Sequence, residues 1–432
     1  MANLPPVCDL HMLGVEMTLG KRFDACKGVG PGFDHLRVGL SLAILFWHSF
    51  GLAYGMEWTR SLPVWPFKPL LAALLPMFFA LSGILVIGSA IRLRNLRTFI
   101  TFRVLRILPA LFTEVSLSAL VFGPLLTAVP LATYFTSSEF YEYFGSFIGR
   151  VRYVLPGLFL TNPVPRVVNG ALWTVGPEIL CYLLLSILIL TRAYNKPRWM
   201  LFLTACFAAT CMAFDPFEPG VIREILPTRA LILAFLSGNL IFLFRDKLPF
   251  SRPLAAVVFG VCVLAISVTQ TTEGYLFLIY PAAACLAYVV AVIGFSGLPP
   301  LPFFHRGDYS YGIYIYGYPI QQAIVHFLPA YRNGWFVFAA ALPVTLLCAI
   351  ASWHLIEKPV LGWRKRLLPA QSAPSQSIGP VIWDRRRVAA IAGLGAYALF
   401  VVFAANIFPV RKAAKWMLGR PDAPIENVRP QF

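Results

Sequence analysis

Long apolar runs alternate with short polar segments along the chain. A membrane-spanning helix needs about 20 mostly apolar residues, and eleven runs approach that length. They cover residues 36–54, 69–91, 105–128, 171–191, 199–214, 226–244, 253–270, 275–296, 309–328, 334–356 and 388–408. The pattern predicts an all-α fold, a polytopic transmembrane helix bundle with a ten-helix core and one additional C-terminal helix.

The polar segments divide this pattern into regions. We expect, in order, a cytoplasmic N-terminal segment 1–32, a transmembrane domain 33–360 of about ten helices, a cytoplasmic linker 361–387, an additional transmembrane helix 388–408 and a short outer tail 409–432. The longest outer loop, 129–170, is interrupted by Pro156, Pro163 and Pro165. Because proline breaks a helix, we expect an interfacial or re-entrant piece there rather than a span.

The basic residues between the runs indicate the orientation of the chain. With the N-terminus in the cytoplasm, the inner segments hold 22 Lys and Arg and the outer loops hold eight. Five more lie in the C-terminal tail, which this orientation places outside. The excess on one side follows the positive-inside rule, so we expect a multi-pass protein with a cytoplasmic N-terminus and an outer C-terminus.

Composition points to the same class of protein. The 432 residues are 58% hydrophobic and only 13% charged, about half the charged fraction of a soluble domain. The net charge of +17 suits nucleic acid, but its clustering between apolar runs argues against that partner. The eight cysteines form no CxxC pair and His is scarce, so we expect neither a metal site nor a disulfide framework.

Ionisable side chains within spans are costly in lipid and are functional candidates. The spans and the mouth of one span hold eight such residues: Arg37, His48, Arg103, Arg106, Glu114, Glu178, His326 and His354. We interpret the last two histidines as structural.

Arg37 and His48 lie on one stripe of the first predicted helix. Eleven residues at about 100° each bring the chain back to within roughly 20° of its starting face, about 16.5 Å further along. Such a stripe fits the wall of a water-accessible cavity. The alternative is that Arg37 reaches the lipid headgroups and His48 hydrogen-bonds inside the bundle.

Arg103 and Arg106 are three residues apart and therefore share a helix face. Two guanidinium groups there suit the phosphates of a cytosolic ligand. Upstream, Ser82 and Gly83 are small enough for a helix or a ligand to approach closely. Ordinary membrane topology explains the other arginines nearby, Arg92, Arg94 and Arg97.

Three further stretches carry polar groups. Glu178 follows Trp173 near the outer mouth of a helix, where we expect its partner to be an Arg or His on another helix; a purely structural ion pair is the alternative. Around the tyrosine-rich segment 309–318, Asp308, Ser310 and Gln321 would line a polar path, whereas an aromatic membrane belt is the simpler explanation. In the third stretch, 353–359, we expect Pro359 to stop the helix and Glu357 to face the cytoplasm.

Motifs spread over residues 33–360 together resemble acyltransferase family 3, integral-membrane enzymes that acylate bacterial surface polysaccharides and related acceptors. They occur in the family's order: Asp34-x-x-Arg37 with His48, "FFALSGILV", Arg103-x-x-Arg106-Ile-x-Pro109, "LWTVGPE" with Glu178, "YSYGIYIY" around Ser310, and "LIEKP". One departure is Gly317, which stands where many relatives have a histidine, so this position cannot transfer protons.

The resemblance implies transfer of an acyl group, often acetyl, from cytosolic acyl-CoA to a sugar or glycan hydroxyl on the outer side of a bacterial inner (cytoplasmic) membrane. The acceptor is free or lipid-linked. His48 would be the essential histidine, which we expect to act as general base in a direct attack; a transient acyl-histidine is the variant left open.

The expected site residues fall into three sets. The catalytic set is His48, Arg37 and Glu178; the donor-binding set is Arg103, Arg106, Ser82 and Gly83; the substrate-binding set is Trp173, Ser310 and Tyr314. Two rival functions are a transporter or flippase of a small metabolite or lipid-linked glycan, and a noncatalytic membrane scaffold. Transporters often have two related halves, and none is visible in this sequence. A scaffold would not need a buried base with an arginine cluster at one mouth.

Overall fold

The computed structural model describes residues 17–26, 30–55, 58, 67–93, 95–214, 226–267, 272–299, 301, 304 and 307–364. The regular structure of these residues is helical, apart from two isolated bridges, Thr18 with Pro249 and Val154 with Val167. The all-α prediction is confirmed. The predicted helix 388–408, the outer tail and nearly all of the predicted linker lie outside the described residues.

Helices occupy all ten of the predicted core ranges. In order, the elements are α1 (Leu19–Ala25), α2 (Gly32–Tyr54), α4 (Phe67–Leu93), α5 (Leu96–Leu117), the π-helix η1 (Ser118–Phe122), α6 (Gly123–Leu126), α7 (Leu131–Thr136), α8 (Ser138–Tyr143), the 3-10 helices η2 (Phe144–Ile148) and η3 (Gly170–Thr174), α9 (Val175–Leu190), η4 (Ala193–Asn195), α10 (Pro197–Phe214), α11 (Thr228–Leu243), α12 (Arg252–Ser267), α13 (Thr272–Gly294), α14 (Ser310–Phe327), η7 (Pro329–Tyr331), α15 (Gly334–Ser352), the π-helix η8 (Trp353–Glu357) and α16 (Lys358–Gly362).

Six helical segments within the described residues are long and apolar enough to cross a membrane: Gly32–Tyr54, Phe67–Leu93, Leu96–Leu126, Gly170–Leu190, Phe277–Gly294 and Gly334–Gly362. Three shorter helices, Pro197–Ala213, Thr228–Leu243 and Arg252–Ser267, are also apolar. Large apolar side chains such as Phe202 and Val257 are exposed on the outside of the bundle. Such a surface suits lipid, so the protein is a membrane protein.

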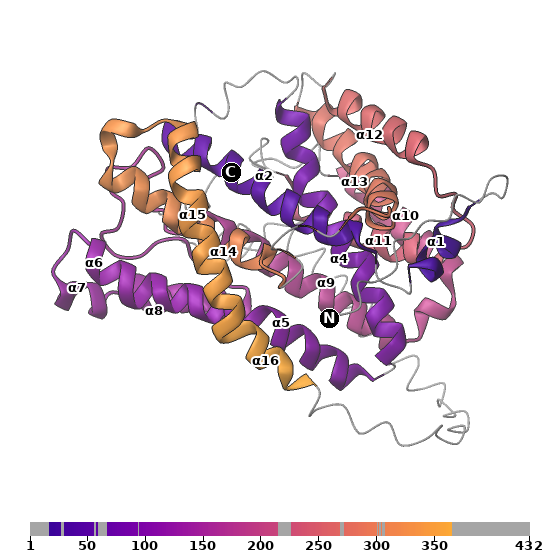
Figure 1. Ribbon diagram of the computed structural model, residues 1–432, viewed down its shortest axis with the longest axis horizontal. Coiled ribbons are helices and arrows are strands. Elements are labelled where there is room, and N and C mark those ends of the chain that lie inside the picture. The colour runs from indigo at the N-terminus through magenta and orange to yellow at the C-terminus, as the bar shows by residue number, and fades with distance from the viewer. Residues whose placement is uncertain are drawn as a thin grey trace, which may run out of the picture.

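Two groups of three helices organise the bundle. In one group α4, α11 and α13 pack against one another, and in the other α2, α14 and α15 do so. Figure 1 shows α14 and α15 on one side of the molecule and α10 to α13 on the other, with α2 and α4 between them. Both α5 and α9 contact α4, while α5 also contacts α14 and α9 also contacts α11. The functional site described below lies at this junction.

Glycines allow α4 and α11 to approach closely. Gly83 lies against the carbonyl oxygen of Phe235, and Gly238 lies against that of Ala80. A Cβ atom at either glycine would collide with the opposite backbone. Small residues at such contacts are typical of membrane helix packing. Gly83 therefore contributes to the helix interface.

The segment 129–170 contains only short helices. It forms α7, α8 and η2 and then returns as an irregular chain, which Figure 1 shows at the edge of the bundle beside α5. Gln322 of α14 holds the irregular part of this segment against the bundle, because its Nε2 donates to the carbonyl oxygens of Val164 (2.9 Å) and Val167 (2.6 Å). No helix in this segment could span a membrane, in line with the three prolines.

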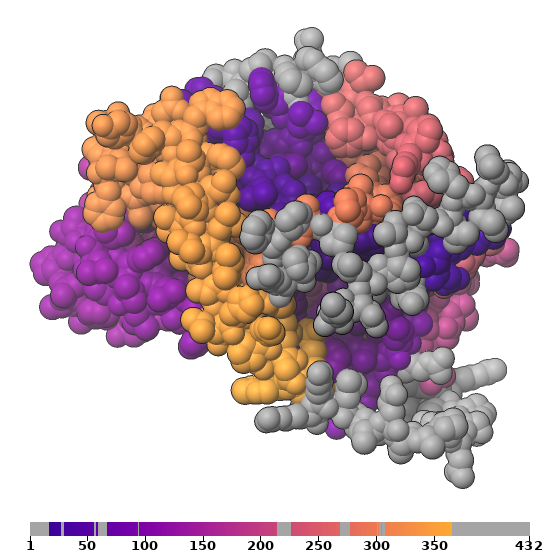
Figure 2. Space-filling view, in the orientation of Figure 1, coloured from indigo at the N-terminus to yellow at the C-terminus, as the bar shows by residue number. Residues whose placement is uncertain are grey.

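The end of α15 differs from the sequence prediction. Pro359 does not stop the helix, because it occupies the first turn of α16, where its missing N–H is not needed. The π-helix η8 joins α15 to α16, and Figure 2 shows the three as one ridge on the visible face. Glu357 does not face the cytoplasm as predicted: it is 1% exposed and bonded to charged and polar groups.

Candidate active site

A cavity lies where the two helix groups meet α5 and α9. Its walls come from α2, α4, α5, η3, α9, α11 and α14. Seven of the ten residues predicted for the site line it: Arg37, Ser82, Arg103, Arg106, Glu178, Ser310 and Tyr314. Residues from positions 37 to 314 thus meet in one place. The lining also includes Thr174, Tyr182 and Tyr311.

Ion pairs close one end of the cavity. Asp308 lies just before α14, and its Oδ2 contacts Arg106 Nη2 at 2.6 Å and Arg37 Nη1 at 3.1 Å. Arg106 Nη1 also contacts Glu357 Oε2 at 3.0 Å. These four residues, Arg37, Asp308, Arg106 and Glu357, are called the ion-pair network below. The network joins α2, α5, η8 and the residue pair before α14. Its two positive charges face its two carboxylates, and Arg37 Nη1 also lies 3.6 Å from the exposed carboxylate of Asp34.

Each carboxylate of the ion-pair network also accepts a hydrogen bond from a serine hydroxyl. Ser310 Oγ donates to Asp308 Oδ1 (2.5 Å), and Ser352 Oγ donates to Glu357 Oε1 (3.2 Å). Burial by itself raises the pKa of Asp308, but the charges of Arg106 and Arg37 outweigh burial and lower that pKa to about 2. Asp308 is therefore ionised at neutral pH.

Arg103 differs from Arg106 although both lie on the same face of α5. Its guanidinium lies over the rings of Phe99 (5.7 Å) and Tyr182 (6.0 Å). It forms no ion pair with any carboxylate in the described part of the chain, and its Nε has no hydrogen-bond partner there. The two arginines that the sequence presents as one motif are thus in different electrostatic environments.

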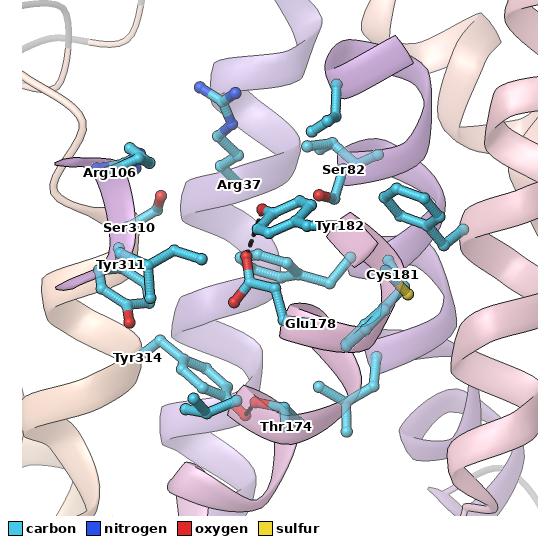
Figure 3. A pocket seen from close by; sticks show the side chains of 18 of the residues that line it. Arg37, Ser82, Arg106, Thr174, Glu178, Cys181, Tyr182, Ser310, Tyr311 and Tyr314 are labelled. Atoms are coloured by element: carbon cyan, nitrogen blue, oxygen red, sulfur yellow. Dashed lines mark hydrogen bonds between the residues drawn. The ribbon is translucent and has the colours of Figure 1, made fainter. Parts of the chain in front are cut away.

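Glu178 projects into the middle of the cavity. Figure 3 shows its carboxylate between the arginines at one end and Tyr314 and Thr174 at the other. The hydroxyl of Tyr182, one turn later in α9, donates to Glu178 Oε1 at 2.6 Å. Among the described residues Glu178 forms no ion pair, so the purely structural ion pair is wrong. The predicted arginines on another helix, Arg103 and Arg106 of α5, act on its carboxylate through their charge without forming an ion pair. The four-residue spacing of Glu178 and Tyr182 is the signal for this contact.

Hydroxyl groups line the opposite end. Tyr314 Oη donates to the carbonyl oxygen of Ala171 (3.0 Å) and lies 2.8 Å from Thr174 Oγ1. The ring of Tyr314 also contacts Phe78 of α4. This end holds neutral polar groups suited to hydrogen bonding with a neutral ligand.

Three predicted site residues do not line the cavity. Gly83 packs against α11, and Trp173 packs against the hydrophobic core around α4. His48 makes an edge contact with the ring of Tyr318, with ring centroids 5.2 Å apart. Tyr318 follows Tyr314 by one turn of α14, so His48 lies beside the hydroxyl-lined end rather than in the cavity wall.

Sequence reasoning overlooked Thr174, Tyr182 and Tyr311, and it gave Asp308 and Glu357 no role in binding arginine. A separate polar cluster surrounds Glu114 of α5, which is 1% exposed and accepts a hydrogen bond from Ser118 (2.9 Å). No group of three or more His, Cys, Asp or Glu side chains among the described residues could hold a metal ion.

Comparisons with known proteins identify the family of the chain. The family described as acyltransferase domain, acyltransferase family 3, matches residues 31–354. An O-acetyl transferase of Shigella phage Sf6 is 25% identical over 76% of this chain and 95% of the phage protein. Nodulation protein 10 of Rhizobium leguminosarum bv. viciae is 28% identical over 81% of this chain and 98% of that protein. No solved structure matches.

Proposed function

The chain belongs to acyltransferase family 3 and is an O-acyltransferase, and on that premise we propose which substrates it joins. The donor is acyl-CoA from the cytosol, with acetyl as the expected acyl group. The acceptor is a hydroxyl of a sugar or glycan, free or lipid-linked, at the outer side of a bacterial inner membrane.

The observation that carries this proposal is the polarity of the cavity. One end holds Arg37 and Arg106, the middle holds Glu178, and the other end holds tyrosine and threonine hydroxyls (Figure 3). Arg103, three residues before Arg106 in α5, also lines the cavity. Acyl-CoA has the same polarity, since its phosphates are anionic and its thioester lies at the end of a neutral arm. Arginine binds phosphate oxygens through charge-assisted hydrogen bonds. The phosphates would bind at the arginine end, with the thioester directed toward Tyr314.

His48 is the proposed general base. It lies eleven residues after Arg37, about 16.5 Å along α2, and its neighbour Tyr318 is one turn from Tyr314. The acceptor oxygen attacks the thioester carbonyl carbon while the His48 imidazole takes the hydroxyl proton. The carbon–sulfur bond then breaks, and the imidazolium returns the proton to the departing thiolate. A base on the acceptor's side does not need to line the donor cavity.

Glu178 is a second candidate for the proton acceptor because its carboxylate projects into the cavity. Replacing each group by an amide separates the two assignments. With His48 as the base, His48→Gln lowers kcat by about 10³-fold, whereas Glu178→Gln retains measurable turnover. The reverse order of the two effects would transfer the role to Glu178.

The experiment that tests the proposed function does not require the acceptor to be identified first. Surface glycans are compared by mass between cells with this protein, cells lacking it and cells carrying the His48→Gln variant. We expect a glycan heavier by one acetyl unit only in the first. Identical glycan masses in all three would contradict the proposed acceptor class. A transporter or flippase instead predicts that acyl-CoA survives intact when acceptor is added.

A further inference from the structure

Arg103 and Arg106 of the motif differ in how far neighbouring carboxylates neutralise their positive charge. Arg106 uses both terminal nitrogens on carboxylates, at 2.6 Å from Asp308 and 3.0 Å from Glu357. The two arginines of the ion-pair network face its two carboxylates, and Arg37 also lies 3.6 Å from Asp34, so the network has little remaining attraction for an anion. Arg103 has no carboxylate partner in the described part of the chain.

A second arginine that has no carboxylate partner among the described residues lies beside Arg103. Arg364, just after α16, stacks on the ring of Phe102 with its Cζ 5.0 Å from the centroid. Its Nη2 donates to the carbonyl oxygen of Phe102 at 2.9 Å. The residue is partly buried, and its Nε has no hydrogen-bond partner among the described residues. Phe102 precedes Arg103 in α5, so two arginines that form no ion pair among the described residues lie along one stretch of helix.

This arrangement is unfavourable without an anion. Burial and the charges of Arg103 and Arg106 lower the pKa of Arg364 to about 10, which reflects both desolvation and like-charge repulsion. The guanidinium nevertheless remains charged at neutral pH. An anion bound between Arg103 and Arg364 would relieve the repulsion and satisfy their open donors.

We propose that Arg103 and Arg364 form the binding site for the phosphate groups of acyl-CoA, and that Arg106 is a positioning residue. The proposal rests on the proposed function, since acyl-CoA is the donor there. It adds a binding residue outside the cavity lining and separates the roles of the two arginines in the motif.

The geometry explains how Arg106 positions this site. Arg106 binds Glu357, and Glu357 lies seven residues before Arg364 in the continuous segment of η8 and α16. The ion pair therefore holds the end of that segment against α5, where Arg364 reaches Phe102. Loss of Arg106 would release this segment and also leave the buried Glu357 without its cation.

Arg245 supplies a matched control. It stacks on Phe242 (4.6 Å) and donates to the carbonyl oxygen of Phe242 (2.9 Å), as Arg364 does with Phe102. It lies after α11 and does not line the cavity. Arg245→Gln therefore removes equivalent local contacts away from the proposed phosphate site.

The test compares acetyl-CoA with acetyl-pantetheine, which lacks the phosphates, as donors for the full-length protein in detergent. We expect Arg103→Gln and Arg364→Gln each to raise the KM for acetyl-CoA about tenfold, the effect of one charge-assisted hydrogen bond. The KM for acetyl-pantetheine should not change. Arg364→Lys should recover part of the loss, and Arg245→Gln should match wild type. Arg106→Gln releases the segment that carries Arg364, so it should lower kcat with both donors and also raise the KM for acetyl-CoA relative to that for acetyl-pantetheine, by less than Arg364→Gln does.

An unchanged KM ratio in Arg364→Gln would overturn the inference, as would a changed ratio in Arg106→Gln with none in Arg364→Gln. For any variant that loses turnover, calorimetry can instead measure the binding of adenosine 3′,5′-bisphosphate. Arg364→Gln should weaken this binding and Arg245→Gln should not. If the wild-type protein transfers from acetyl-CoA but Arg364→Gln behaves as wild type, only this inference fails. If the wild-type protein neither transfers from acetyl-CoA nor binds the bisphosphate, the proposed function fails.

Discussion

The two ends of the cavity are built from different chemical groups and are held together differently. At one end the ion-pair network joins four segments of the chain through charges at 2.6–3.1 Å. At the other end, neutral hydroxyls of Tyr314 and Thr174 bond to each other and to a nearby carbonyl. The charged end can fix an anionic donor through Arg103, which has no ion pair among the described residues, whereas the neutral end can admit an uncharged sugar.

The two ends of the cavity should also respond differently to substitution. Removing one member of the ion-pair network leaves a buried charge without its partner, which destabilises a protein strongly. Removing a hydroxyl costs a single hydrogen bond. We therefore expect substitutions at the charged end to alter stability and donor binding, and substitutions at the neutral end to alter turnover and acceptor binding.

The largest expected effect lies at the neutral end. His48→Gln should lower kcat by about 10³-fold, because a general base contributes about 10²–10⁴-fold, and should leave the donor KM unchanged. The matched control is His326→Gln, since His326 makes a similar edge contact with Phe159 (5.7 Å). Equal losses in both variants would show that His48 acts only through packing.

Arg106→Gln should produce the largest loss of stability. It breaks the contacts with Asp308 and the buried Glu357, and we expect the free energy of unfolding to fall by about 3 kcal/mol. Thermal unfolding in detergent measures the loss. Adding Glu357→Gln should cost less than the sum of the two single substitutions, because it removes the unpaired carboxylate. Strict additivity would show that the two residues are not coupled.

Acid should weaken the charged end through Asp308. The pKa of Asp308 is about 2 in the folded protein and 3.8 in the unfolded chain, so folding favours the ionised form. Its stabilisation, about 2 kcal/mol, is complete above pH 3.8 and is lost as the pH falls toward 2. Melting temperatures between pH 6 and pH 3 should therefore fall more steeply for wild type than for Asp308→Asn. Parallel curves would contradict this role.

The smallest effect is expected from Tyr314→Phe. It removes the hydroxyl that bonds to Ala171 and contacts Thr174, worth about 1 kcal/mol. The KM for the acceptor should rise a few-fold while the KM for acetyl-CoA stays constant. A rise confined to the acetyl-CoA KM would reverse the assignment of the two ends.

Periodic features of the sequence predicted the fold well. The apolar runs predicted all ten core helices. A segment that lies in lipid must be continuously apolar, and it must be helical so that its backbone hydrogen bonds are made within the segment. Motif residues gave seven of the cavity-lining side chains. The prediction failed where distant contacts override local signals. Pro359 is a helix breaker in isolation, but here it begins α16 after a π turn.

Pairing across helices was the harder problem. The spacing of Arg103 and Arg106 correctly indicated one helix face, but spacing cannot show that Asp308 and Glu357 pair with Arg106 and not with Arg103. Glu178 was expected to find a partner on another helix, whereas Tyr182 on its own helix satisfies it. Gly83 suited either a ligand or a helix neighbour, and only the packing of α4 against α11 decides between them.

One measurement tests the central claim most directly. The purified protein is placed in liposomes with acetyl-CoA on one side and, on the other, glycan extracted from cells that lack the protein. We predict that acetyl groups appear on the glycan and that free coenzyme A thiol appears in equal amount on the donor side, with neither product formed by His48→Gln. Passage of intact acetyl-CoA across the membrane, or an unmodified glycan with no thiol released, would contradict the account.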